Sequence, residues 1–106
     1  MVVSEIDAHE LKTRLDAGEL IEVIDVRSDA EVAQGVLPQA MHLPMHLIPM
    51  RMHDLPRDKE IIIYCRSGAR SYQTCAYLRQ NGVDNVVNLR GGIIGWAQRG
   101  FEIRAA

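Results

Sequence analysis

The feature that most constrains the fold of this chain is an apolar run, Glu60-Ile61-Ile62-Ile63-Tyr64, which stops abruptly at Cys65. Three consecutive β-branched residues favour a strand, and an unbroken apolar run is typical of a strand that is covered on both faces. The segment from Ser71 to Asn81 has a helical pattern, and Gly82 is suited to end that helix. A buried strand that leads through a short loop into a helix is the unit of which parallel α/β sheets are built.

The rest of the chain repeats this alternation of strands and helices. Asp7 with Glu10, and Ser28 with Glu31, have the spacing of helix N-caps with a reciprocal partner. These pairs predict one helix that runs to about residue 17 before Gly18 and one short helix that ends at Gly35. The other predicted segments are a strand over 21–26, an extended piece at 41–43 between Pro38 and Pro44, a helical turn or two over 49–55, a strand over 86–89, and a helix that follows Gly91-Gly92 and ends at Gly100.

Length and charge narrow the possible functions. The 106 residues, 47% of them hydrophobic, fit a single domain over 1–106. A net charge of -2 argues against a nucleic-acid partner, which normally requires a basic surface. No window approaches the roughly 18 apolar residues that a membrane span needs, and residues 1–7 lack the pattern of an export signal. We therefore expect a cytoplasmic protein with no membrane partner, in which both cysteines are free thiols.

Cys65 follows the most buried strand, at the end of a parallel sheet where ligands bind. A tight loop that enters a helix turns backbone N–H groups inward, and the helix dipole adds partial positive charge. Arg66 and Arg70 add two cations, and Gly68 permits a positive φ. All of these favour the thiolate, so we expect a lowered pKa and a nucleophilic Cys65.

The predicted site has Cys65 as the catalytic residue. The alternative is an inert buried thiol beside solvated arginines, but a strand end, a helix start, a glycine and paired arginines coincide here. The loop expected to bind a small anionic substrate such as thiosulfate, phosphate or sulfite comprises Arg66, Ser67, Gly68, Ala69 and Arg70, with support from Ser71 and from the pair Asp25 and Arg27.

The spacing of this loop separates two anion chemistries. Cysteine-dependent phosphatases place five residues between cysteine and arginine, whereas Cys65 and Arg70 enclose four, and Ser71 stands at the phosphatase arginine position. A shorter loop gives a smaller cradle, which suits a persulfide better than a phosphocysteine.

Three blocks occur in order along the chain: Val23-Ile24-Asp25-Val26-Arg27 with Glu31, Gly35 to Pro38 and Ala40; Ile63 to Ser71; and Leu89-Arg90-Gly91-Gly92-Ile93 followed by Trp96. Together they resemble the signatures of the single-domain rhodanese (thiosulfate sulfurtransferase) family over nearly the whole chain. The resemblance implies a mostly parallel five-stranded central sheet flanked by helices on both faces.

The resemblance also implies a sulfurtransferase with ping-pong chemistry and no metal or organic cofactor. Cys65 would take the sulfane sulfur of thiosulfate or a persulfide donor, release sulfite in the thiosulfate case, and pass the sulfur from its persulfide to cyanide, a cellular thiol or a sulfur-accepting protein. Alternatives are a persulfide carrier or a regulatory binding module with little turnover and, less favoured, a cysteine-dependent phosphatase or arsenate reductase.

The chain departs from the family pattern in a few places. Val36 and Leu37 stand where His-Ile is usual, and Gln39 replaces a glycine before Ala40, which puts the local turn and any contact of that histidine in question. Arg66 replaces a glycine that is common in mercaptopyruvate-using relatives, and this second cation favours a doubly charged donor such as thiosulfate.

The remaining chemically notable side chains are expected to be structural. Cys75, on the helix after the loop, is expected to pack as a small apolar residue rather than to form a disulfide with Cys65, because disulfide geometry is narrow. His42, His46 and His53 lack a metal-ligand spacing. The methionines Met41, Met45, Met50 and Met52 are expected to be core and rim contacts, and Trp96 is expected to lie in the core.

Overall fold

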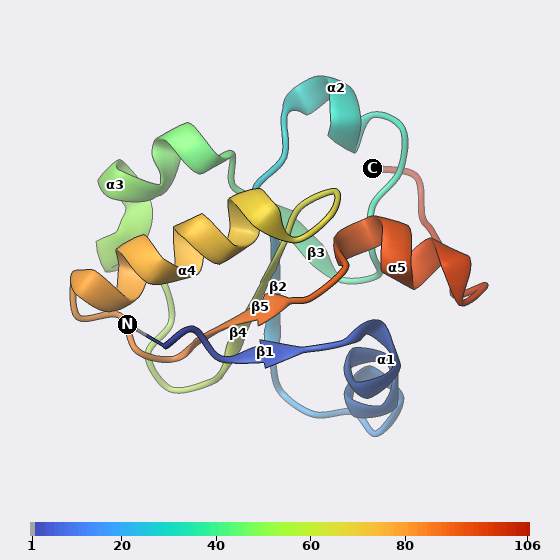
Figure 1. Ribbon diagram of the computed structural model, residues 1–106, viewed down its shortest axis with the longest axis horizontal. Coiled ribbons are helices and arrows are strands. Elements are labelled where there is room, and N and C mark those ends of the chain that lie inside the picture. The colour runs from blue at the N-terminus through green and yellow to red at the C-terminus, as the bar shows by residue number, and fades with distance from the viewer. Residues whose placement is uncertain (1) are drawn as a thin grey trace.

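A five-stranded sheet forms the centre of the computed structural model, which describes residues 2–106 (Figure 1). In spatial order its strands are β1 (Glu5–Ile6), β5 (Val86–Leu89), β4 (Ile61–Tyr64), β2 (Glu22–Asp25) and β3 (Ala40–His42). All four strand pairs run parallel. The central strand is the predicted apolar run, and all four of its residues are fully buried.

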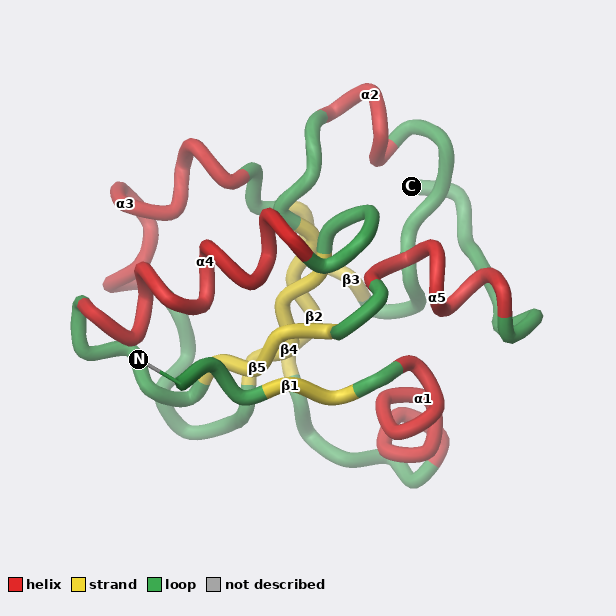
Figure 2. Tube along the Cα trace, in the orientation of Figure 1, coloured by secondary structure: helices red, strands yellow, loops and turns green. Residues whose placement is uncertain are grey.

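Helices cover both faces of the sheet, which confirms the predicted fold class. They are α1 (Ala8–Asp16), α2 (Asp29–Val32), the 3₁₀ turn η1 (Met45–Leu47), α3 (Ile48–Arg51), the 3₁₀ turn η2 (Met52–Asp54), α4 (Ala69–Gln80) and α5 (Gly92–Gln98). α3 and α4 lie over one face and α1 and α5 over the other, while α2 lies beyond the end of the sheet near the β4–α4 loop (Figures 1 and 2).

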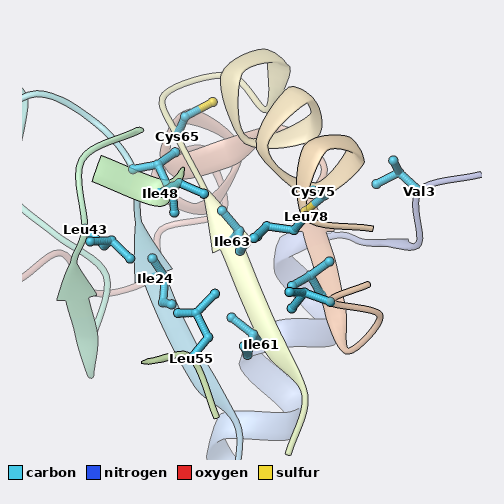
Figure 3. Packing of buried hydrophobic residues seen from close by; sticks show 13 residues of the cluster. Val3, Ile24, Leu43, Ile48, Leu55, Ile61, Ile63, Cys65, Cys75 and Leu78 are labelled. Carbon is cyan, nitrogen blue, oxygen red and sulfur yellow. The ribbon is translucent and has the colours of Figure 1, made fainter. Parts of the chain in front are cut away.

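The core is divided between the two faces because side chains alternate along β4. Ile61, Ile63 and Cys65 face the cluster beneath α3 and α4, where they meet Leu78 among others (Figure 3). Ile62 and Tyr64 belong to the opposite cluster with residues of α1 and α5. Cys65 therefore continues the inward alternation of the strand by one more position.

Both predicted N-caps are present, but the predicted reciprocal partner takes part at Ser28 and not at Asp7. Asp7 accepts a hydrogen bond from the Glu10 amide, and Ser28 and Glu31 form a reciprocal capping box at α2. These local signals depend only on residues three positions apart, which explains why the sequence predicts them well.

Several element boundaries differ from the prediction. The two-residue strand β1 was not predicted, because it is short and becomes a strand only by pairing with β5. The helical region expected from residue 49 begins at Met45, directly after Pro44. α4 begins at Ala69 rather than Ser71, because Gly68 in a left-handed conformation (φ 104°) starts the helix without a side-chain cap.

The departures at residues 36–39 lie in a stretch of backbone that contains one left-handed residue and one isolated bridge. Gln39, at the position of the family glycine, keeps a left-handed φ of 66°, which is unfavourable for a side chain that is not glycine. Val36 pairs through its backbone with Arg104 in an isolated antiparallel bridge, so its side chain does not determine this contact.

None of the helices within residues 2–106 combines the length and the apolar character that crossing a membrane would require.

Candidate active site

Cys65 lies at the carboxyl end of β4, and its side chain is almost completely buried, with an exposed fraction of 1%. Its Sγ accepts hydrogen bonds from the Gly68 amide (3.1 Å), the Ser71 amide (3.4 Å) and the Ser71 hydroxyl (3.3 Å). The sulfur points away from Ile63 and the other labelled core side chains, into the loop before α4 (Figure 3). The predicted inward-facing amides are thus present around this thiol.

These hydrogen bonds determine the ionisation of the thiol. Burial by itself would raise the pKa of Cys65, but the Ser71 hydroxyl and the amides of Ser71, Gly68 and Ser67 more than offset it, so the pKa lies below its ordinary value. Donors that point at a sulfur atom favour its charged form. The Cys65 thiol is therefore easier to ionise than an ordinary cysteine, although it is almost completely buried.

The start of α5 fixes the orientation of the Cys65 loop. The Ile93 amide donates to the Cys65 carbonyl (3.0 Å), and the Ile94 amide donates to the Arg66 carbonyl (3.1 Å). Because these carbonyls are held toward α5, the following amides are free to turn toward the sulfur. Figure 2 shows the β4–α4 loop beside the start of α5.

The close approach of α5 requires glycine at position 92. A Cβ atom added to Gly92 would lie 2.6 Å from the Cys65 carbonyl oxygen and closer still to the Arg66 carbonyl. Such contacts lie well inside van der Waals distance. The Gly91-Gly92 pair thus serves the cysteine loop, a role that the sequence pattern alone did not assign.

Gly68 is the second glycine on which the loop depends. Its φ is 104°, and an added Cβ would meet the Gly91 amide nitrogen at 3.2 Å and the Leu89 carbonyl at 3.3 Å. The buried side chain of Asn88 donates to the Gly68 carbonyl (3.2 Å), which holds the Gly68 peptide on the β5 side. Asn88 was not predicted as a site residue, because nothing near it in sequence indicates a contact with this loop.

The two loop arginines differ in their surroundings. Arg66 is exposed and lines a cavity beside α5. Arg70 forms a two-pronged ion pair with Glu31, with both N–O distances at 2.8 Å. The pKa of Glu31 falls to about 2, chiefly because of the hydrogen bonds from Arg70.

This pairing changes the predicted electrostatics. The groups that lower the pKa of Cys65 are the Ser71 hydroxyl and the amides, whereas Glu31 largely neutralises Arg70. The pKa of Arg70 is raised first by Glu31, and a Cys65 thiolate adds to this, so Arg70 still lies close enough to attract charge at the sulfur. Sequence reasoning identified Glu31 as a helix cap and missed its ion pair across the site.

Asp25 and Arg27 form the expected pair, buried at the end of β2. Arg27 Nη2 donates to Asp25 Oδ2 at 2.7 Å and to the Gly35 carbonyl at 2.7 Å. The Tyr64 hydroxyl donates to Asp25 Oδ2 at 2.6 Å and accepts from the Leu37 amide at 3.1 Å. Burial and Asp25 raise the pKa of Tyr64, so the tyrosine remains a neutral donor in this network.

Two cavities flank the loop. The larger, about 510 Å³, is lined by Val26, Arg27, Ser28, Asp29, Pro44, Met45, His46 and Arg70. The smaller, about 250 Å³, lies against α5 and includes Arg27, Glu31 and Arg66. Arg27 lines both, Arg70 only the first and Glu31 only the second, so the Glu31–Arg70 ion pair lies at the boundary between them.

Cys75 lies in the core with no exposed surface, as expected. Burial raises its pKa to about 12, so it remains a protonated thiol. Figure 3 shows it on α4 beside Leu78, apart from Cys65. The two cysteines thus differ in that the pKa of Cys65 is lowered and the pKa of Cys75 is raised.

The histidines do not gather at one place. His42 Nε2 lies 2.7 Å from the Arg27 carbonyl oxygen, and His46 lines the larger cavity. Over residues 2–106, no three side chains of His, Cys, Asp or Glu form a group that could hold a metal ion.

The methionines and Trp96 differ in how far they are buried. Met45 and Met52 pack against the core cluster as expected, whereas Met41 and Met50 are exposed. Trp96 is fully buried, and its Nε1 donates to the Glu102 carbonyl at 2.7 Å.

Comparison with known proteins agrees with the fold. Residues 7–99 match the family model described as Rhodanese-like domain. The chain is 56% identical over 104 residues to a protein named sulfurtransferase from Allochromatium vinosum, which covers 98% of this chain and 97% of that protein. It is 45% identical over 96 residues to the putative sulfurtransferase YtwF of Bacillus subtilis, with 91% and 92% covered.

A solved structure shows the same arrangement. The rhodanese-like domain protein of Staphylococcus aureus superposes with a TM-score of 0.85 at 35% identity, over 97% of this chain and all of that one. On the match of the family model and of these relatives, the chain belongs to the family of rhodanese-like domains.

Proposed function

We propose that this protein is a sulfurtransferase that carries a sulfane sulfur on Cys65. The observation that carries the proposal is the set of three hydrogen bonds that Sγ accepts from Gly68 and Ser71. The proposal is supported by relatives named sulfurtransferases, one of them 56% identical over nearly the full length of both chains. In the reducing cytoplasm, where we expect the protein, the thiol would be available for reaction.

The first half-reaction uses the thiolate as a nucleophile. With thiosulfate, Cys65 Sγ attacks the outer sulfur, a new S–S bond forms, and the original S–S bond breaks with its electron pair leaving on sulfite. With a persulfide donor, a thiolate leaves instead. The product is a Cys65 persulfide anion, which the same inward-facing amides favour because they respond to negative charge on sulfur.

The second half-reaction returns the enzyme to its starting state. A nucleophilic acceptor, such as cyanide, a cellular thiol or a cysteine of a sulfur-accepting protein, attacks the outer sulfur of the persulfide. The bond between Cys65 Sγ and the outer sulfur breaks, and its electron pair returns to Sγ, which restores the Cys65 thiolate. Stabilisation of that thiolate by Ser71 makes it a good leaving group.

The proposal predicts that thiosulfate adds one sulfur, about 32 Da, to the intact protein. Cys65→Ser should abolish the adduct, because the nucleophile is lost. Cys75→Ser is the matched control and should load normally, since Cys75 lies apart from the loop with a raised pKa. Intact-mass spectrometry of all three proteins measures this. An unmodified wild type, or an adduct that persists in Cys65→Ser, would contradict the proposal.

The burial of Cys65 supports a second candidate, a persulfide carrier or regulatory module that turns over slowly on free small molecules. An exposed fraction of 1% limits the approach of an acceptor to the sulfur. The two candidates separate in the second half-reaction: a sulfurtransferase loses the added mass rapidly with cyanide or a thiol, whereas a carrier retains it until a partner protein is present. A phosphatase is disfavoured, because Ser71 at the arginine position donates to the sulfur itself.

A further inference from the structure

Resting on the proposed function, we propose that Glu31 determines donor specificity. By holding Arg70, it makes the site select against doubly charged sulfur donors such as thiosulfate and favour sulfane donors that carry a single negative charge.

The first ground is the geometry of the ion pair. Arg70 Nη1 and Nη2 each donate to a different Glu31 oxygen at 2.8 Å, the arrangement in which a carboxylate satisfies a guanidinium most fully. Glu31 is itself held in place, because the Ser28 amide and hydroxyl donate to its Oε1. The carboxylate therefore occupies both Nη donors of Arg70 that could otherwise bind an incoming anion.

The second ground is the charge that remains around the cavities. Arg27 is paired with the buried Asp25, and Arg70 is paired with Glu31. Within residues 2–106, Arg66 makes no ion pair and is exposed. The approach to the sulfur thus offers less positive charge than the number of arginines indicates.

The third ground is position. Glu31 lines the smaller cavity, so a donor that enters there meets its carboxylate directly, whereas a donor in the larger cavity meets Arg70 with its charge already offset by Glu31. A dianion is repelled about twice as strongly as a monoanion at the same place. Glu31 therefore opposes the preference for thiosulfate that Arg66 indicated in the sequence.

Glu31→Gln is the variant that isolates this charge. Glutamine can still accept from Ser28, as in a capping box, so α2 retains its cap while Arg70 loses its ionic partner. Asp29→Asn is the matched control for a general change of charge: it removes a carboxylate from the same helix that also lines the larger cavity, but Asp29 is 96% exposed and pairs with His42 rather than with Arg70.

The first readout is alkylation of Cys65 by iodoacetate and by iodoacetamide, followed by mass spectrometry of the Cys65 peptide. The ratio of the two rates reports charge at the site, because the thiolate fraction and the accessibility of the sulfur affect both reagents alike. We expect Glu31→Gln to raise the iodoacetate-to-iodoacetamide ratio about three- to tenfold at low salt, and much less at about 1 M salt. Asp29→Asn should change the ratio by less than about twofold.

The second readout compares two sulfur donors, thiosulfate (two negative charges) and methanethiosulfonate (one). For Glu31→Gln we expect kcat/KM for thiosulfate to rise about fivefold relative to methanethiosulfonate, chiefly through a lower KM for thiosulfate. If Glu31 had a purely structural role, the substitution would change kcat/KM equally for both donors.

The outcomes separate the two proposals. An unchanged alkylation ratio in Glu31→Gln, or an equal rise in Asp29→Asn, would overturn the role of Glu31. A raised alkylation ratio would also overturn the role of Glu31 if kcat/KM changed equally for thiosulfate and methanethiosulfonate. If the alkylation ratio rises as expected but neither donor loads sulfur onto wild type, the proposed function fails while selection by Glu31 against anionic reagents at Cys65 stands.

Discussion

Cys65 combines two properties that oppose each other. Its side chain is removed from solvent, which disfavours a charge, yet three hydrogen-bond donors surround the sulfur and favour one. The donors outweigh burial and lower the pKa of Cys65, because the loop already orients them and no rearrangement is needed. Cys75, with similar burial and without such donors, shows the opposite result in its raised pKa.

At the residue scale, Ser71→Ala should raise the pKa of Cys65, because the Ser71 hydroxyl is the largest of the influences that lower it. Only the thiolate reacts, so the alkylation rate falls as the pH decreases through the pKa of Cys65. In Ser71→Ala this decrease in rate should occur at a higher pH than in wild type. At neutral pH we expect the rate to drop about tenfold, since a hydrogen bond to a charged group contributes about 1.5 kcal/mol or more.

The rate of alkylation in this variant at high pH serves as its internal control. At a pH where Cys65 is fully ionised in both proteins, Ser71→Ala should react about as fast as wild type. A lower rate at every pH with an unchanged midpoint would show that Ser71 supports the loop structurally rather than the charge on the sulfur.

At the scale of elements, the site is formed by one strand and two helices. β4 delivers Cys65, α4 supplies the Ser71 donors, and α5 holds the carbonyls of Cys65 and Arg66 through the Ile93 and Ile94 amides. The terminal Gly-Gly signature is thus part of the site although it follows the cysteine by more than twenty residues. Helix α5 can approach so closely only because Gly92 has no side chain.

Gly92→Ala should therefore damage the site from a distance in sequence. The added Cβ would collide with the backbone of Cys65 and Arg66, so α5 must move away and the two hydrogen bonds to the loop weaken. We expect a loss of about 2–4 kcal/mol in the free energy of unfolding and weak sulfur loading. Chemical denaturation and intact-mass spectrometry measure the two effects.

Gly95→Ala is the matched control on the same helix. No atom lies within 4 Å of a Cβ built at Gly95, and alanine is favoured over glycine in a helix by about 0.5–1 kcal/mol. This variant should be as stable as wild type or more so and should load normally. Equal damage by both substitutions would contradict the role assigned to Gly92.

At the scale of the whole molecule, a buried polar network ties the sheet to the segment that crosses its end. Tyr64 on β4 donates to Asp25 on β2 and accepts from the Leu37 amide, while Arg27 reaches the Gly35 carbonyl. The network crosses from the central strands to residues 35–37, which also pair with the C-terminal segment through Val36 and Arg104. Its loss should therefore weaken the domain as a whole.

Tyr64→Phe tests this network with minimal change of shape. It removes a donor from Asp25 and leaves the Leu37 amide without its acceptor, which should cost about 1–3 kcal/mol in the free energy of unfolding. Tyr77→Phe, at a tyrosine that is 36% exposed, should change stability by less than about 0.5 kcal/mol. Denaturant titration of the two variants and wild type measures both values. If Tyr64→Phe were as stable as wild type, the buried network would contribute nothing to stability.

The sequence by itself determined the features that depend on neighbouring residues. The unbroken β-branched run Ile61-Ile62-Ile63 defined the central strand and placed Cys65 at its end, and the Ser28–Glu31 spacing defined the start of α2. These features follow from steric preference, side-chain period and capping, which act over a few positions. The reactive character expected of Cys65 also followed from its local loop.

Only the tertiary structure decided which distant groups complete the site. Glu31 meets Arg70 across 39 positions of sequence, Asn88 reaches Gly68 across 20, and β1 becomes a strand only by pairing with β5. No local pattern encodes these contacts, because each depends on how the crossover helices bring separate strand ends to one edge of the sheet. The sequence thus specified the thiol that we propose as the nucleophile, and the fold specified the charged groups around its loop.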